Sequence, residues 1–331
     1  MSAGSVLAAL DPDRYDAVPI GITESGRWVL PPADTKLAID GGRLPAVPAS
    51  AEARHPTQLL DGVDVVLPLL HGPFGEDGTI QGLLELAGIP YVGSGVFASA
   101  AAMDKHHMKQ LLVAAGLPVP DYVVVRRDRP VPVDVRKLAL PVFVKPARGG
   151  SSIGITRVDD WGELDDAIAE ATRHDPKVLV EAGVSGREVE CGVLAGGDGR
   201  PQASVPAEIL VGNGHDFYDF EAKYLSDTSF AIPPDLPAGT VEEIRRLAVG
   251  AFEALDCEGL ARVDFFVVDA APGDGSDPSG PSRLLVNEIN TMPGFTPTSM
   301  FPQMWAAAGV DYPTLVDRLL QDALRRGTGL R

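Results

Sequence analysis

The feature that most constrains this chain is an apolar run that ends in two polar residues whose side chains point to the same face. Residues 284–286 predict a buried strand, and Glu288 and Asn290 follow it two positions apart. Side chains two positions apart on a strand point to one face. Pro293 and Gly294 then predict a tight turn. Two oxygen-bearing side chains aimed at one point suit a hard cation such as Mg²⁺, although a polar strand end before a solvated turn gives the same pattern.

A second apolar run, at 260–268, carries charge in its middle. Arg262 and Asp264 alternate along it and so share one face of the predicted strand. Charged side chains rarely enter such a strand unless they are paired or bind a ligand. Asp264, Glu288 and Asn290 together have the composition of an Mg²⁺ site with positions left for phosphate oxygens. Arg262 would then offset negative charge on a transferring group, and a buried structural ion pair is the alternative.

The composition is that of a folded, acidic protein in which positive charge is available only locally. The 331 residues are 45% hydrophobic and 22% charged, enough for two or three compact domains. The net charge of −18 argues against a nucleic-acid or anionic-membrane partner, so locally placed Lys and Arg must meet any anionic substrate. Cys191 and Cys257 lack metal-ligand spacing and are expected to be reduced and partly buried. The sequence has no apolar run of 18 residues and no N-terminal signal pattern, so we expect a cytoplasmic protein.

The chain divides into three predicted regions, at 1–94, 95–180 and 181–331, of which the first is an α/β domain. Its expected helices are at 1–10 and 78–87, and its expected strands are at 18–22, 28–30, 36–39, 63–70 and 89–92. The run at 63–70 is of the continuous apolar type found in parallel sheets. A doubly wound domain normally begins with a central strand. A domain that opens on a helix is therefore unusual, or the chain starts downstream of its natural beginning.

The other two regions are predicted to mix strands with amphipathic helices. For 95–180 the expected helices are at 99–115 and 160–172, and the expected strands are at 122–125, 141–145, 155–158 and 177–181. For 181–331 the expected strands are at 188–194, 202–209, 260–268 and 284–286, and the expected helices are at 240–255 and within 301–326. Arg246 and Leu247 are expected to mark opposite faces of the helix at 240–255.

A glycine-rich connection between two strands suits a phosphate. Residues 148–154 are mostly small, so their backbone N–H groups can wrap a phosphate without side chains in the way. The segment lacks the spacing of a Walker loop, and an ordinary hairpin is the alternative. Lys145, at the end of the preceding strand, is a sensible phosphate clamp. Lys105 is a second candidate, although a lone helical lysine is more often solvated.

Three further groups give weaker signals. His71 follows the strongest apolar run of the first region and is placed to orient a substrate, because such loops face the ligand crevice of an open α/β sheet. Glu76 and Asp77 are predicted to cap the helix that follows them. Glu181 and Glu188 flank a glycine-containing connection. Carboxylates there can receive an adenine amino group and ribose hydroxyls, although a pair of surface acids is the default interpretation.

With these motifs in order, the chain resembles the D-alanine–D-alanine ligase family of the ATP-grasp superfamily. The resemblance runs from about residue 10 to the C-terminus and implies an α/β ATP-grasp fold behind an N-terminal Rossmann-like domain. The matching segments are HGPFGEDGTIQGLLELAGIPYVGSG (71–95), MDK (103–105), FVKPARGGSSIG (143–154), FEAKYLSD (220–227), ARVDFF (261–266) and NEINTMPGFTPTSMFP (287–302). Several long motifs in family order are far more specific than one glycine-rich loop.

The resemblance implies a reaction and the residues that serve it. ATP phosphorylates the carboxylate of a first D-alanine, and the amine of a second D-alanine attacks the acyl phosphate. The implied ATP-binding residues are Lys105, Lys145, Ser151, Ser152, Glu181, Glu188, Lys223 and Asn287. The implied ligands of two Mg²⁺ ions, with Mn²⁺ as a substitute, are Asp264, Glu288 and Asn290. The implied catalytic residues are Ser151, Lys223, Tyr224, Arg262 and Gly294, and those for the D-alanine substrates are His71, Ser299 and Met300.

The resemblance also bears on specificity and assembly. It places Lys223 and Tyr224 in a loop that closes over the site and excludes water from the acyl phosphate. This pair is more similar to the dipeptide-forming branch than to the branch that uses D-lactate. A ligase for D-lactate or D-serine, and a nucleotide-binding protein without catalysis, are the alternatives. Family members are often dimers, so a homodimer is expected by resemblance alone.

The start of the chain departs from the family pattern. Family members begin with a strand and a glycine-rich loop that carries a Ser-x-Glu-His-x-Val-Ser motif, whose glutamate helps hold the amine of the first D-alanine. This chain begins inside the helix that follows, so we expect a natural start upstream and a Rossmann-like domain that lacks its first strand. A missing central strand would leave neighbouring backbone unpaired. A smaller departure is at Ala182 and Gly183, where many relatives carry bulkier residues beside the adenine.

Overall fold

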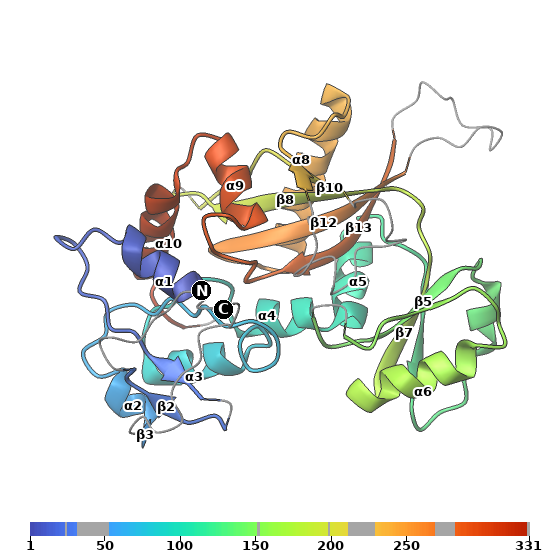
Figure 1. The fold of residues 1–331 in the computed structure, drawn as a ribbon, viewed down its shortest axis with the longest axis horizontal. Coiled ribbons are helices and arrows are strands. Elements are labelled where there is room, and N and C mark those ends of the chain that lie inside the picture. Colours follow the sequence, from blue (N-terminus) through green and yellow to red (C-terminus); the bar gives the residue numbers. More distant parts are fainter. Residues whose placement is uncertain are drawn as a thin grey trace.

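Three β-sheets organise the chain, and the largest lies at its centre (Figure 1). The structure is a computed structural model that describes residues 1–23, 25–31, 53–150, 153–197, 199–210, 229–268 and 282–329. Within these residues a six-stranded sheet, a four-stranded sheet and a small three-stranded sheet succeed one another from the C-terminal to the N-terminal part of the chain. The helices pack around them and between them.

The six-stranded sheet is antiparallel throughout, in the order β11-β10-β8-β12-β13, with β9 paired to β8. Its strands are β8 (Arg187–Ala195), β9 (Pro201–Ala203), β10 (Ala207–Leu210), β11 (Ser229–Ala231), β12 (Leu260–Val268) and β13 (Arg283–Asn290). The predicted strands at 188–194 and 260–268 are confirmed. The predicted strand at 202–209 is wrong as one element, because Pro206 has no N–H to donate to a ladder and the N–H of Gly192 on β8 donates to the side-chain hydroxyl of Ser204.

The two faces of this sheet have different chemistry. Along β12, Val263, Phe265 and Val267 are fully buried and alternate with residues that face the other way. The buried face packs against α4 (Val96–Met103), α5 (Lys105–Ala114) and α8 (Ala238–Ala254) in one continuous apolar core. The opposite face presents Arg262 and Asp264, as the alternation predicts. The sheet therefore holds a core on one side and polar side chains on the other.

A β-bulge at Asn287 keeps Glu288 and Asn290 of β13 on the polar face. Asp264 pairs with Glu288, but the next residue, Phe265, pairs with Val286, so Asn287 is an extra residue in the ladder. The extra residue leaves Val286 in the core while Glu288 and Asn290 lie opposite Asp264 and Arg262. The common facing of Glu288 and Asn290 predicted from their spacing is confirmed.

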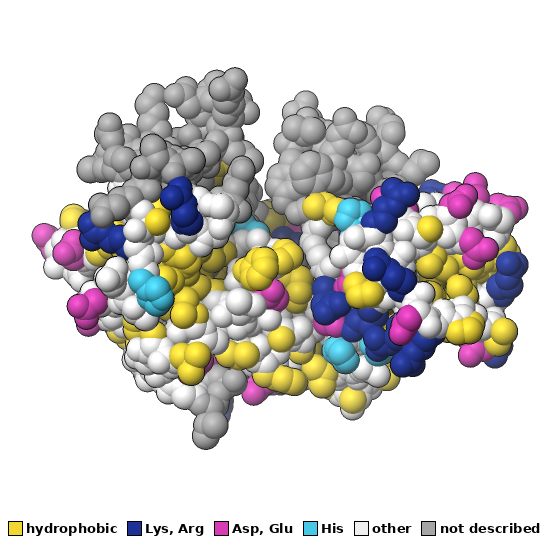
Figure 2. Space-filling model, turned by 90° about the horizontal axis from the view of Figure 1, so that it is seen from below, with side chains coloured by type: hydrophobic (Ala, Val, Ile, Leu, Met, Phe, Trp, Pro, Cys, Tyr) yellow, Lys and Arg dark blue, Asp and Glu magenta, His cyan; other side chains and the backbone are white. Residues whose placement is uncertain are grey.

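The four-stranded sheet has the order β4-β7-β5-β6, with α6 packed on one face. Its elements are β4 (Tyr122–Arg126), the 3-10 helix η1 (Val133–Lys137), β5 (Val142–Pro146), β6 (Thr156–Val158), α6 (Leu164–His174) and β7 (Lys177–Ala182). Residues 95–180, which hold most of this sheet, carry 12 Lys and Arg against 11 Asp and Glu, although the whole chain has a net charge of −18. Figure 2 shows Lys and Arg side chains gathered on the half of the visible face where this sheet and α6 lie.

The predicted helix at 99–115 is two helices that meet at Asp104. This residue adopts an extended conformation (φ −90°, ψ 96°), and its carboxylate accepts hydrogen bonds from the backbone N–H groups of His106 and His107. The carboxylate also forms a buried ion pair with Lys177 of β7. The N–H of Lys105 donates to the carbonyl of Ala147 at 2.8 Å. A capping residue with a buried partner therefore overrides the helical pattern.

The first region contains short elements: α1 (Ser2–Ala9), β1 (Gly21–Ile22), β2 (Trp28–Val29), β3 (Ala53–Arg54), α2 (Pro56–Leu59) and α3 (Thr79–Ala87). The predicted strands at 63–70 and 89–92 are wrong, since the described residues give them a single parallel bridge between Val66 and Tyr91. A strand needs a ladder of partners, and hydrophobicity alone does not supply one. The strand predicted at 36–39 lies outside the described residues.

The two C-terminal helices pack against β8 of the six-stranded sheet and against α1. They are α9 (Met300–Ala307) and α10 (Tyr312–Arg326), and they share a second apolar core with α1. On α8, Leu247 is buried while Arg246 is exposed and pairs with Glu243, so their predicted opposite facing is confirmed. None of the described helices is both long and apolar enough to span a membrane.

Candidate active site

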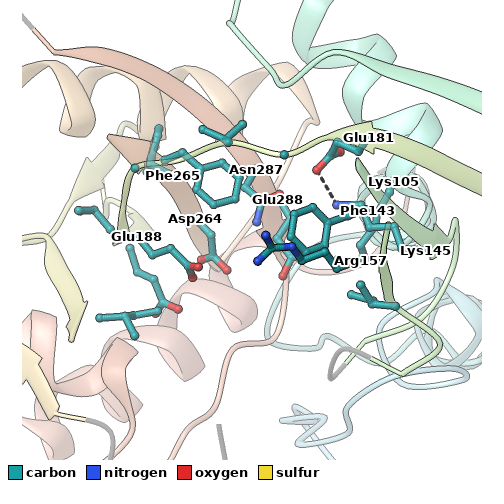
Figure 3. A pocket seen from close by; sticks show the side chains of 18 of the residues that line it. Lys105, Phe143, Lys145, Arg157, Glu181, Glu188, Asp264, Phe265, Asn287 and Glu288 are labelled. Carbon is teal, nitrogen blue, oxygen red and sulfur yellow. Dashed lines mark hydrogen bonds and ion pairs between the residues drawn. The ribbon is translucent and has the colours of Figure 1, made fainter. Parts of the chain in front are cut away.

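A cavity of about 770 Å³ lies between the six-stranded and the four-stranded sheets. Figure 3 shows Lys145 and Glu181 on one side of it and Asp264 and Glu188 on the other. Its polar lining brings together seven of the sequence-predicted residues: Lys105, Lys145, Glu181, Glu188, Asp264, Asn287 and Glu288. The size and the mixed lining are those of a pocket for an organic ligand with charged groups.

The acidic end of the cavity is held by Arg262. Its guanidinium donates to both oxygens of Asp264, at 2.7 and 2.8 Å, and its Nε lies 3.0 Å from Glu190. Burial opposes the charged guanidinium, but Asp264 and Glu190 outweigh this effect and raise the pKa of Arg262 above its ordinary value. The amide of Asn290 donates to Asp264 at 3.2 Å. The arginine is thus a permanent cation fixed by two carboxylates.

The same donor set fits a hard divalent cation. Asp264, Glu288 and Asn290 present two carboxylates and an amide from paired positions of neighbouring strands. An amide that turns its oxygen toward Asp264 completes an all-oxygen set, the type Mg²⁺ prefers. Glu188, two positions before Glu190 on β8, also lines the cavity. The prediction that these side chains share one face of β12 and β13 is confirmed. That they bind a metal ion stays a prediction.

Lys105 connects this acidic end to the glycine-rich connection. Its ammonium donates to the carbonyl of Gly149 at 3.0 Å and lies 3.4 Å from a carboxylate oxygen of Glu288. A cation at the first turn of α5 therefore stands between the loop that can wrap a phosphate and the acids that can hold a metal. Ser151 and Ser152 of this loop lie outside the described residues, as do Lys223 and Tyr224.

The other end of the cavity carries a buried charge cluster around Glu181. Lys145 lies 2.7 Å from one oxygen of this carboxylate, and Lys109 lies 2.8 Å from the other. The ammonium of Lys145 is therefore a partner of Glu181, whereas the sequence prediction gave these two residues separate phosphate and adenine sites. Lys109 and Glu190 are functional candidates that sequence reasoning missed. Glu190 shares the facing of Glu188, and Lys109 follows Lys105 by one helical turn, so both had a periodic signal.

The loop after residue 70 faces the acidic cluster. His71 lies 3.1 Å from the carbonyl of Met292, beside the turn that ends β13. The predicted capping role is confirmed for Asp77, which accepts a hydrogen bond from the N–H of Thr79, the first residue of α3. It is wrong for Glu76, whose carboxylate accepts from the N–H of Gly72 instead. Burial, and then the neighbouring Glu288, raises the pKa of Glu76 to about 7.

The turn after β13 leads directly into α9. A side chain at Gly294 would come within 3.2 Å of the Ser299 hydroxyl, so the small residue allows a close approach. The Ser299 hydroxyl accepts from the N–H of Thr296 at 3.0 Å and lies 2.8 Å from the hydroxyl of Thr296. Ser299 precedes the first residue of α9, Met300, which is buried. A helix N-terminus at this place suits a carboxylate.

Family profiles match almost the whole chain. The profile described as D-ala D-ala ligase N-terminus matches residues 1–94, and that described as D-ala D-ala ligase C-terminus matches residues 111–321. The chain is 55% identical to a D-alanine–D-alanine ligase from Frankia casuarinae and 56% identical to one from Rhodococcus opacus. In both comparisons all of this chain and 94% of the relative are covered.

Solved structures of the same kind superpose on it. A D-alanine-D-alanine ligase from Coxiella burnetii gives a TM-score of 0.77 at 33% identity, over 98% of this chain and 89% of that one. The VanG D-Ala:D-Ser ligase from Enterococcus faecalis gives 0.76 at 34% identity, over 97% and 94%. A D-alanine–D-alanine ligase from Bacillus anthracis complexed with ATP gives 0.74 at 28% identity, over 98% and 92%.

Two sheets that enclose a pocket with lysines at one end and an arginine-held acidic cluster at the other define an enzyme of the ATP-grasp class. The matches extend along the full length of the chain. The chain belongs to the D-alanine–D-alanine ligase family.

Proposed function

We propose that this protein joins two D-alanine molecules to D-alanyl-D-alanine with ATP as the energy source, for peptidoglycan synthesis. The observation that carries the proposal is the cavity between the two sheets, with its lysines at one end and the cluster of Asp264, Glu288 and Asn290 at the other. Family membership supports the same reaction. We propose that the chain has three domains, at 1–94, 95–180 and 181–331, which together carry out this reaction.

ATP is proposed to lie along the cavity with its triphosphate near Lys105 and its adenine near Glu181. Lys105 stands beside Gly149, so the glycine-rich connection and the ammonium group can meet the phosphates together. Lys145, Ser151, Ser152 and Lys223 complete the proposed nucleotide site, with Glu188 at the ribose and Asn287 beside the metal-binding strand.

Asp264, Glu288 and Asn290 would hold two Mg²⁺ ions, for which Mn²⁺ could substitute. Bound there, the metal neutralises phosphate charge and orients the transferring group. Arg262 contacts the carboxylates of both Asp264 and Glu190 and offsets part of their negative charge. A guanidinium that is held in place before the reaction needs no reorganisation when an oxyanion forms.

The D-alanine substrates are proposed to bind between the acidic cluster and the turn after β13. The first carboxylate accepts a phosphoryl group from ATP, which releases ADP, and the amine of the second D-alanine then displaces phosphate from the acyl phosphate. Gly294 would add a backbone donor for the oxyanion. Ser299 and Met300, at the start of α9, would receive the second carboxylate, and His71 would orient the substrate. Ser151, Lys223 and Tyr224 are proposed to close over the site.

The direct test measures ADP and phosphate release with D-alanine alone, and again with D-lactate, D-serine or L-alanine as the second substrate. We expect turnover and a dipeptide product with D-alanine alone. Binding of ATP with no phosphate release at any D-alanine concentration would refute the proposal and leave a nucleotide-binding protein. Faster turnover with D-lactate or D-serine would make the chain a ligase for that acceptor.

Glu288→Gln tests the metal assignment. The amide keeps the shape of the side chain but removes a charged ligand, so we expect kcat to fall by about a hundredfold or more. The matched control is Glu253→Gln, an exposed glutamate on α8, which should leave kcat unchanged. Wild-type turnover in Glu288→Gln would refute the assignment.

The assembly and location are proposals from family membership and chemistry. A homodimer is proposed by family resemblance, and sedimentation or light scattering would test it. A cytoplasmic location is proposed because the substrate ATP and the two reduced, buried cysteines belong in that compartment.

A further inference from the structure

Lys109 is a fully buried lysine to which the reaction gives no task. Its side chain has no exposed surface, and its ammonium lies 2.8 Å from the Glu181 carboxylate. It also donates to the carbonyl of Asn287 at 3.4 Å and lies 5.9 Å from the ring centre of Tyr122. Burial of a lysine is costly unless its charge is used by a partner. The partner is Glu181.

Glu181 is held between two lysines. One of its oxygens lies 2.7 Å from Lys145, and the other lies 2.8 Å from Lys109. Burial alone would raise the pKa of Glu181, but Lys109 and then Lys145 outweigh this effect and hold it below its ordinary value. Lys109 offsets the charge of the second oxygen, for which the described residues offer no further hydrogen-bond donor, so that oxygen keeps acceptor capacity.

The protonation state of Glu181 decides which purine it can accept. An ionised carboxylate can only accept hydrogen bonds, and the 6-amino group of adenine donates them. Hypoxanthine has a 6-oxo group in the same place, which also only accepts. A protonated carboxyl group has an O–H that donates to a 6-oxo group. A buried glutamate that loses a neighbouring cation gains a proton more easily.

We propose that Lys109 is a positioning residue for nucleotide selectivity: it holds the Glu181 carboxylate ionised and fixed, so that the site accepts a 6-aminopurine and rejects a 6-oxopurine. The proposal rests on the contact of Glu181 with the adenine. Lys109 acts only through Glu181 and does not touch the nucleotide.

The helix that carries Lys109 is packed into the core. Its neighbour Met108 and, one turn further, Leu112 are fully buried in the core beneath the six-stranded sheet. Lys105 lies four positions earlier on α5 and therefore on the same side of the helix. One helix thus places one ammonium beside Glu288 and a second beside Glu181, at the two ends of the cavity.

The experiment compares kcat/KM for ATP and for ITP, which carries hypoxanthine, in the wild type and in four variants. Lys109→Met removes the charge but keeps an unbranched chain. We expect it to lower the preference for ATP over ITP by about tenfold to a hundredfold, the size of a lost hydrogen bond to a charged group. The KM for D-alanine should stay within about twofold. Lys137→Met, at an exposed lysine of η1, is the matched control and should keep the preference.

Glu181→Gln and the double variant Lys109→Met with Glu181→Gln separate the possible outcomes. Glu181→Gln should relax the preference, because an amide can donate or accept. The double variant should show the same preference as Glu181→Gln alone, since Lys109 has nothing left to act on. The double variant leaves no unpaired charge on Glu181, so it tests the proposal even if Lys109→Met does not fold.

Two results overturn the inference. One is an equal loss of ATP and ITP turnover in Lys109→Met, which indicates a structural role only. The other is a double variant whose preference for ATP over ITP differs from that of Glu181→Gln. This result would show that Lys109 affects the preference by a route other than Glu181. An unchanged preference in Glu181→Gln would instead refute the adenine contact in the proposed function.

Discussion

Replacing Glu76 by glutamine is expected to change how the stability of the metal-free protein depends on pH. The carboxyl group of Glu76 lies beside the acidic cluster, where burial and then Glu288 raise its pKa from 4.5 to about 7. Among the described residues its carboxylate accepts one hydrogen bond, from the N–H of Gly72, and a glutamine oxygen can accept the same bond. The variant therefore imitates the protonated glutamate at every pH.

The direction of this pH dependence follows from whether the folded or the unfolded protein binds the proton. Between about pH 4.5 and 7 the folded protein keeps a proton on Glu76 that the unfolded chain has lost. The stabilisation from this proton is complete below pH 4.5 and is lost as the pH rises to about 7. The full pKa shift corresponds to about 3 kcal/mol at 1.36 kcal/mol per pH unit. Solvent contact of the partly exposed side chain brings the expected effect to about 2 kcal/mol.

The assay is thermal unfolding of both proteins in a chelating buffer at pH 4.5 and at pH 8. Near pH 4.5 the melting temperatures should agree, and at pH 8 the Glu76→Gln variant should unfold about 3 °C higher, as about 2 kcal/mol implies for a chain of this size. Glu253→Gln, at an exposed helical site, controls for the change of residue type and should follow the wild type at both pH values. A Glu76→Gln variant whose difference from the wild type is the same at both pH values would refute the reasoning.

Three further outcomes are expected. Burial raises the pKa of the thiols of Cys191 and Cys257 to about 12, so a thiol reagent at pH 8 should label them only after denaturation; fast labelling of the folded protein would contradict this. Gly192→Ala would bring a Cβ within 2.9 Å of the Trp305 indole nitrogen, and denaturant titration should show a loss of about 1–3 kcal/mol rather than an unchanged midpoint. Asp104→Ala leaves Lys177 buried without its carboxylate and should cost about 3–5 kcal/mol, whereas Asp104→Glu should cost clearly less; equal losses would show that the charge is unimportant.

The common facing of the residues proposed to bind metal was predictable because it depends on a local period. Arg262 and Asp264 alternate along one strand, and Glu288 and Asn290 alternate along the next, so each pair must share a face whatever the rest of the chain does. The strands themselves were predictable from apolar runs bounded by turn residues. Long strands and helices with a strong pattern were confirmed for this reason.

The contacts between elements were not predictable from these patterns. The bulge at Asn287 adds one residue to a ladder without changing the composition of the strand. The pairing of Lys145 with Glu181 joins residues 36 positions apart, and no local rule brings them together. The apolar run at 63–70 shows the opposite error, since a strand also needs partners that only the three-dimensional arrangement provides. Charge pairs and ladders are properties of neighbours in space.

The junction at Asp104 has a mechanical consequence. The start of α5 is fastened to the four-stranded sheet through the ion pair with Lys177 and the bond from Lys105 to Ala147, while the rest of the helix is packed beneath the six-stranded sheet. One rigid rod therefore belongs to both bodies, and we expect any rotation of one sheet against the other to have its axis close to this junction. Points near an axis move least. The end of the cavity where Lys105 contacts Gly149 would keep its geometry while the opposite end opens. The proposed phosphate site would therefore stay assembled as nucleotides enter and leave.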